Sequence, residues 1–113
     1  ASFSAATANN YAPASLAGKT VTMKEGGTTI GSGTFNKDGT LTFTETGEPP
    51  EILIYNYAPF SPLGGMLMVM HADGSGSYLQ MQFNNATSGA WFETDYDSMG
   101  NYQGVYSGTF TVN

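Results

Sequence analysis

The sequence predicts an all-β domain in which about eight short antiparallel strands follow one another as an up-and-down meander. Segments of alternating apolar and polar residues are separated by turn signals roughly every 8–12 residues. Apolar residues nowhere repeat at helical spacing over three turns. The connections are too short for the crossovers that parallel strands need. We expect the strands to close into a barrel, because closure removes exposed strand edges, with a β-sandwich as the alternative.

The first four predicted strands cover residues 19–25, 28–36, 40–46 and 51–58. Residues 37–39, Lys-Asp-Gly, form the clearest turn, because Asp-Gly between alternating runs favours a tight hairpin. In the strand that follows, Leu41 and Phe43 are expected to face inward and the threonines outward. Residues 47–50 contain Gly and two prolines, which end the ladder.

The other four predicted strands cover residues 66–72, 77–83, 89–95 and 102–112, with a loop at 59–65 and turns at 73–76, 84–88 and 96–101. Leu79, Met81 and Phe83 are predicted to face inward. Trp91 and Phe92 are consecutive, so a regular strand sends them to opposite faces. Residues 52–57 and 66–70 are apolar at both sets of alternate positions, although the outside of a barrel in water should be polar.

A chain of 113 residues has room for one domain. Residues 1–17 are rich in Ala, Ser and Asn, lack periodicity and predict a flexible leader, so residues 18–113 form the barrel. The small, polar start is typical of a chain after removal of a signal peptide. This start, together with few lysines and many Thr, Ser, Gly and Asn, predicts an exported protein. The protein is expected in the periplasm, on the cell surface or outside the cell, and no membrane span is expected.

Charge restricts the partners that this chain can have. Nine acidic residues stand against three lysines and no arginine, which gives a formal net charge of −6. Nucleic acids and anionic membrane surfaces are recognised by basic residues, so neither is an expected partner. The chain contains no cysteine, which excludes thiol catalysis and thiolate metal sites.

Four segments carry a resemblance to a known family: APASLAGKTVTM (12–23), GTFNKDGTLTFT (33–44), SYLQMQFNNATSGAWFETDY (77–96) and YSGTFTV (106–112). They resemble segments of small exported bacterial lipocalin-like domains of the calycin type. Within them, SLAGKT at Ser15–Thr20 and ATSG at Ala86–Gly89 are turn signatures. The resemblance implies an eight-stranded lipocalin-like barrel and identifies no functional residues.

Catalysis is not expected. His71 is the only histidine, and no Ser-x-x-Lys, Gly-x-Ser-x-Gly or His-Glu-x-x-His pattern occurs. A structural or solvent-exposed role for His71 is favoured over a base or a metal ligand, because neither a nucleophile nor further ligands lie near it in the sequence. Met66, Met68 and Met70 share one strand face and His71 lies on the other, so a joint copper site is disfavoured.

The turn after residue 95 has oxygen-rich side chains at Asp95, Asp97 and Asn101, which resemble part of a calcium loop. Asp, Ser, Gly and Asn are also the ordinary residues of a hairpin turn, and the turn is the favoured interpretation. Whether this turn also binds calcium is left open by the sequence. No metal or cofactor is expected elsewhere.

Aromatic and methionine side chains are the strongest functional signal. We expect a protein partner, or a second copy of the chain, to bind an apolar outer face of the barrel. The alternative is a small hydrophobic or aromatic ligand inside the barrel, since an eight-stranded barrel holds either packed side chains or one small ligand. The residues predicted to bind the ligand or partner are Tyr55, Tyr57, Phe60, Met66, Met68, Met70 and Trp91.

Overall fold

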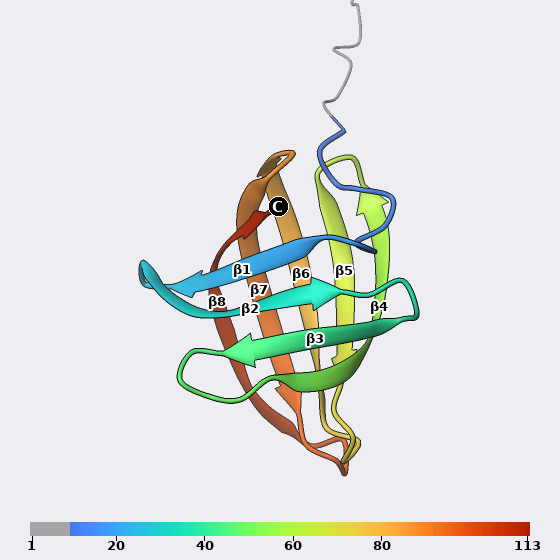
Figure 1. The fold of residues 1–113 in the computed structure, drawn as a ribbon, viewed down its shortest axis with the longest axis vertical. Coiled ribbons are helices and arrows are strands. Elements are labelled where there is room, and N and C mark those ends of the chain that lie inside the picture. The colour runs from blue at the N-terminus through green and yellow to red at the C-terminus, as the bar shows by residue number, and fades with distance from the viewer. Residues whose placement is uncertain (1–9) are drawn as a thin grey trace, which may run out of the picture.

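The computed structural model describes residues 10–113 and shows a closed eight-stranded antiparallel barrel (Figure 1). The strands are β1 (Thr20–Glu25), β2 (Thr28–Phe35), β3 (Thr40–Glu45), β4 (Glu51–Ser61), β5 (Gly64–Met70), β6 (Gly76–Asn85), β7 (Ser88–Tyr96) and β8 (Tyr102–Val112). Each strand pairs with the next, and β8 pairs with β1 to complete the barrel. The predicted all-β meander is therefore confirmed. No helix among residues 10–113 is long and apolar enough to cross a membrane.

The β2–β3 hairpin forms where the Asp-Gly pair predicts it. Gly39 has a φ angle of 89°, in the region that residues with a side chain rarely adopt. The Asp38 carboxylate accepts hydrogen bonds from the Thr40 amide at 3.0 Å and the Thr40 hydroxyl at 2.6 Å. These bonds lower the pKa of Asp38 and hold the turn in register.

The prediction of a loop at 59–65 was wrong, because the connection between the two strands is much shorter. Strand β4 continues through Pro59 to Ser61, and β5 begins at Gly64, so only residues 62 and 63 form the turn. The ladder shifts register between Pro59 and Ser61. A register shift of this kind accommodates a proline, which has no amide hydrogen for the ladder.

Alternation along the strands separates a buried inner set from an outer set. Trp91 is 2% exposed and faces inward, whereas Phe92 is 49% exposed and faces outward. On β8, Gly108 lies opposite Trp91 in the ladder. A Cβ atom at position 108 would lie 2.7 Å from the Trp91 ring, so the absence of a side chain there makes room for the indole.

Residues 10–17 cover one end of the barrel, which we call the closed end. Leu16 is 1% exposed and joins the core together with Ala12. The amides of Tyr11 and Ala12 donate to the Pro62 carbonyl at 2.8 and 2.9 Å. This part of the predicted leader thus packs against the barrel through its apolar side chains. Residues 1–9 of the predicted leader lie outside the described residues.

Candidate functional site

The barrel encloses a cavity of about 250 Å³. Buried apolar side chains form most of its wall, and half-buried Met23, Ile30 and Phe43 complete the apolar part. The inward side chains Leu41, Leu79, Met81 and Phe83 are buried as predicted, yet they do not fill the interior. The barrel is therefore packed toward its closed end and hollow toward the other, which we call the open end.

The inner positions change from apolar to polar toward the open end. On β7 the inward series runs Gly89, Trp91, Glu93, Asp95, and on β3 the series Leu41, Phe43 ends at Glu45. The polar residues that line the cavity are Glu45, His71, Ser77, Glu93 and Asp95. An apolar chamber with a few converging polar groups is the usual composition of a small-molecule site.

Two neighbouring carboxyl groups of β7 lie in the cavity wall. Asp95 accepts a hydrogen bond from the Ser77 hydroxyl at 2.7 Å, which fixes its carboxylate. The Glu93 carboxyl is half-buried and hydrogen-bonds to Asp95. Burial, followed by the Asp95 hydrogen bond and the charges of Asp95 and Glu25, raises the pKa of Glu93 to about 8. Glu93 therefore holds a proton at neutral pH.

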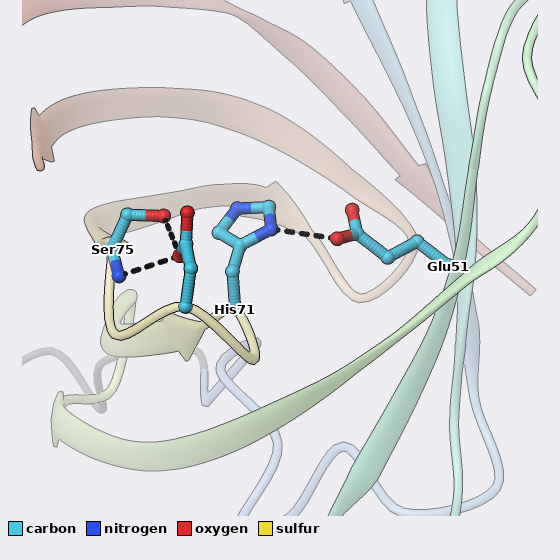
Figure 2. Close-up of polar contacts among 4 residues, drawn as sticks. Glu51, His71 and Ser75 are labelled. Atoms are coloured by element: carbon cyan, nitrogen blue, oxygen red, sulfur yellow. Dashed lines mark hydrogen bonds and ion pairs between the residues drawn. The ribbon is translucent and has the colours of Figure 1, made fainter. Parts of the chain in front are cut away.

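His71 lies at the rim of the open end, directly after β5. Its Nδ1 lies 3.0 Å from a Glu51 carboxylate oxygen at the start of β4. Figure 2 shows the ring turned toward Glu51, with Ser75 on the opposite side of His71. The Ser75 hydroxyl instead donates to Asp73 at 2.6 Å. Among residues 10–113, no hydrogen bond joins a hydroxyl group to His71, so this dyad lacks an adjacent nucleophile.

A second depression lies beside the cavity, at the β3–β4 loop. This depression of about 440 Å³ is lined by the loop and shares Phe43, Glu45 and His71 with the cavity wall. Strands β3 and β4 pair over only four positions, from Thr40↔Ile54 to Phe43↔Glu51, so Glu45 has no partner on β4. The ladder is thus open beside the polar end of the cavity.

Charge is divided between the two ends of the barrel. Eight of the nine acidic residues belong to the open end, either near the ends of strands or in its loops: Glu25, Glu45, Glu48, Glu51, Asp73, Glu93, Asp95 and Asp97. Lys19 and Lys37 lie at the closed end, and Lys24 is exposed near the open end. The entrance to the cavity therefore lies in a strongly negative field.

Three of the residues predicted to bind a ligand or partner are not on the outer face. Trp91 lies in the cavity wall, with its indole N–H donating to the Thr109 carbonyl at 3.0 Å. Tyr55 and Tyr57 are half-buried against the core. The Tyr55 hydroxyl donates to the Asn36 carbonyl at 3.1 Å and the Tyr57 hydroxyl to the Pro13 carbonyl at 2.8 Å. Alternation from buried Leu53 places both tyrosines on the inner side.

The other four residues point outward. Phe60 is exposed near the closed end, and Met66, Met68 and Met70 are the outward side chains of β5. The methionines lie beside exposed residues of the neighbouring strands, with Ile54 paired to Met70 and Tyr78 to Met68. We call this the outer apolar face, which consists of Ile52, Ile54, Met66, Met68, Met70, Tyr78 and Phe92.

The β7–β8 connection forms the predicted turn. One Asp97 carboxylate oxygen accepts hydrogen bonds from the amides of Met99 at 2.9 Å and Asn101 at 2.8 Å. Asp95 is instead directed to Ser77, so the two carboxylates do not converge. Within residues 10–113, no three His, Asp or Glu side chains gather as a metal site.

The acidic pair in the cavity was missed by sequence reasoning, which considered Asp95 only as part of a calcium loop. The signal that could have found it is alternation, because Trp91, Glu93 and Asp95 are every second residue of one strand. If Trp91 faces the core, the two acids must face it as well. Buried acidic residues are uncommon, so such a series indicates a polar interior site.

Comparison with known proteins supports the architecture. The chain is similar to a crystal structure described as that of "a putative beta-lactamase from Burkholderia vietnamiensis", with a TM-score of 0.64 and 16% sequence identity. The similarity covers 85% of this chain and 94% of that one. No protein-family model matches the sequence. The search of curated proteins also found no match. At this level of identity the similarity shows the shared barrel fold.

Proposed function

We propose that this protein is a non-catalytic binding protein that takes a small, mainly apolar ligand into its barrel. The observation that carries the proposal is the cavity of about 250 Å³ lined by apolar residues, with polar groups confined to one end. An apolar cavity of about 150 Å³ is enough to bind benzene. The chamber is therefore suited to a one-ring ligand with a short chain.

A binding role agrees with the arrangement of the polar groups better than catalysis does. In the part of the chain that the structure describes, no hydroxyl hydrogen-bonds to His71, and the hydroxyls of Ser75 and Ser77 donate to carboxylates. The similar crystal structure makes β-lactam hydrolysis the reaction to test. We expect no turnover of a chromogenic β-lactam, and turnover that His71→Ala abolishes would contradict the proposal.

We also propose that the domain works as an exported lipocalin-like module. The supporting features are the turn signatures within Ser15–Thr20 and Ala86–Gly89, the small number of lysines and the abundance of Thr, Ser, Gly and Asn. The eight-stranded meander is the architecture that the resemblance to lipocalin-like domains implies.

Ligand entry is expected to change the fluorescence of Trp91, because this residue is the only tryptophan and lines the cavity. Titration with phenylbutanol should give a saturable change. Val69→Phe places a large ring inside the cavity and should weaken binding by about tenfold or more, since even small steric conflicts in a packed interior are costly.

Met68→Phe is the matched control, because Met68 is adjacent to Val69 on β5 but faces outward. This variant should bind phenylbutanol like the unmodified protein. Binding in the folded Val69→Phe variant at unchanged affinity would show that the ligand lies elsewhere. The complete absence of saturable binding of phenylbutanol, phenylbutylamine and phenylbutyrate would overturn the proposed function.

A second candidate function is self-association through the outer apolar face. Ile52 and Ile54 are 68% and 64% exposed, and the outward positions of β4–β7 carry no charged residue. Exposed apolar patches without charge are typical of contact surfaces. In this candidate the methionines belong to the contact surface, as predicted. The contact residues of β4 are Ile52 and Ile54 instead of the predicted Tyr55 and Tyr57.

Ile54→Lys is expected to shift any dimer to monomer, because it places a charge at the centre of this face. Sedimentation velocity over a concentration series measures the effect. Thr34→Lys, on the outer side of β2, is the control and should leave the dimer intact. If the unmodified protein is monomeric at its highest soluble concentration, the outer apolar face does not mediate self-association.

A further inference from the structure

We propose that the ligand is an amphiphilic cation, whose apolar body occupies the barrel cavity and whose ammonium group binds between Glu93 and Asp95. This inference rests on the proposed function and specifies its ligand class. It follows from the combination of an apolar chamber with a carboxyl pair in its wall. The following structural features favour a cation over a neutral or anionic ligand.

Among residues 10–113, the carboxyl pair has no cationic partner. Within residues 10–113, His71–Glu51 is the one ion pair, and no lysine lines the cavity. Asp95 is held by the neutral Ser77 hydroxyl, which leaves its charge uncompensated. Charges in a low-dielectric wall are usually paired, so an unpaired carboxylate facing a cavity favours a ligand that supplies the positive charge.

Acidic residues on several other strands also lie near the pair and favour a cationic ligand. Glu25 of β1 raises the pKa of Glu93 through its charge, and Glu45 of β3 lines the same cavity. Glu51 of β4 and His71 after β5 form the rim, and Tyr106 of β8 pairs with Glu93 in the ladder. Only His71 among these groups can become cationic. An anionic ligand would meet repulsion from every acidic group named here.

The apolar part of the wall favours an organic cation over a metal ion. Metal ions of the calcium and magnesium type need about six or more oxygen ligands, and their affinity depends on several carboxylates in contact. Here the two carboxyl groups line the same cavity as apolar side chains that include Leu79 and Trp91. Such a chamber stabilises a hydrocarbon body and provides an aromatic ring near the charged end.

Proton exchange should accompany binding. Glu93 is protonated at neutral pH because its pKa is raised to about 8. An ammonium group beside it lowers this pKa, so the complex holds fewer protons than the free protein. Affinity for a permanently charged cation should therefore increase as pH rises from 6 to 8, by up to about tenfold per pH unit, and level off above pH 8.

The test compares ligands that share one apolar body: phenylbutanol, phenylbutylamine and phenylbutyrate. Calorimetric titration at pH 7 should show the amine binding about tenfold or more tightly than the alcohol, and the carboxylate more weakly than the alcohol. Asp95→Asn should reduce the preference for the amine to within about threefold. Asp97→Asn removes a charge two residues away, where the turn is exposed, and should leave the preference unchanged.

A second measurement uses trimethyl(phenylbutyl)ammonium, whose charge does not titrate. In two buffers of different ionisation enthalpy, its binding at pH 7 should release close to one proton, and Glu93→Gln should abolish that release. Phenylbutanol should release none in either protein.

The outcomes separate the two proposals. If phenylbutanol binds as tightly as phenylbutylamine, the cationic ligand class is wrong while binding in the barrel stands. If none of the ligands binds, both proposals are wrong. If the amine binds the folded Val69→Phe variant unchanged, or if calcium chloride displaces it at equimolar concentration, the ammonium site in the cavity is wrong.

Discussion

Replacing Trp91 with Ala is expected to lower the free energy of unfolding by about 3–5 kcal/mol. Trp91 is the largest side chain that is almost fully buried, and it packs over Gly108 of the neighbouring strand. Its removal leaves a void that joins the existing cavity, and the Thr109 carbonyl loses its indole donor. Urea unfolding followed by circular dichroism measures the change without depending on tryptophan fluorescence.

Phe92→Ala is the matched control for this experiment. Phe92 is the next residue along β7, but it faces solvent, so its removal should change stability by only about 0.5 kcal/mol. An equally large loss at Phe92 would show that this ring is covered, as it would be in an oligomer formed through the outer apolar face. Trp91→Phe keeps most of the apolar volume and should retain a larger share of the stability than Trp91→Ala.

Replacing Glu93 with Gln is expected to stabilise the protein at alkaline pH and to leave it unchanged near pH 4. The pKa of Glu93 is about 8 in the folded protein, against an ordinary value of 4.5. The folded state thus holds a proton that the unfolded chain has released between these two pH values. The free energy of unfolding must therefore fall as pH rises through this window, and reach its lower plateau above pH 8.

Gln has the shape of the protonated carboxyl and can still donate to Asp95, but it does not titrate. After allowance for solvent at the open end, the variant should exceed the unmodified protein by on the order of 2 kcal/mol at pH 8.5, or about 8 °C in Tm. Thermal unfolding at pH 4, 6 and 8.5 measures the difference. A gain of equal size at all three pH values would mean that Glu93 does not titrate within this window.

Ligand binding should reverse this pH effect. A bound cation compensates the ionised pair, so trimethyl(phenylbutyl)ammonium should raise the Tm of the unmodified protein more at pH 8.5 than at pH 6. The same pair of residues thus connects stability, proton release and ligand selectivity. Buried groups with strongly shifted pKa values commonly mark functional sites.

The sequence alone determined the strands, their order and most of the turns. Alternation and turn residues act over a few neighbouring positions, so Thr40–Glu45 and the turn at Gly39 can be identified from local pattern. The short connections then required each strand to pair antiparallel with the next. The end of β4 was missed, because a strand that accommodates Pro59 through a register shift has no local signature.

Only the tertiary structure decided which residues face the cavity. Residues 52–57 and 66–70 are apolar at both alternate sets, so hydrophobicity could not show that Tyr55 faces inward and Ile54 outward. Barrel closure brings Glu25 of β1 near Glu93 of β7, far apart along the chain. The size of the cavity depends on how large side chains from all eight strands, with Leu16 at the closed end, pack against one another.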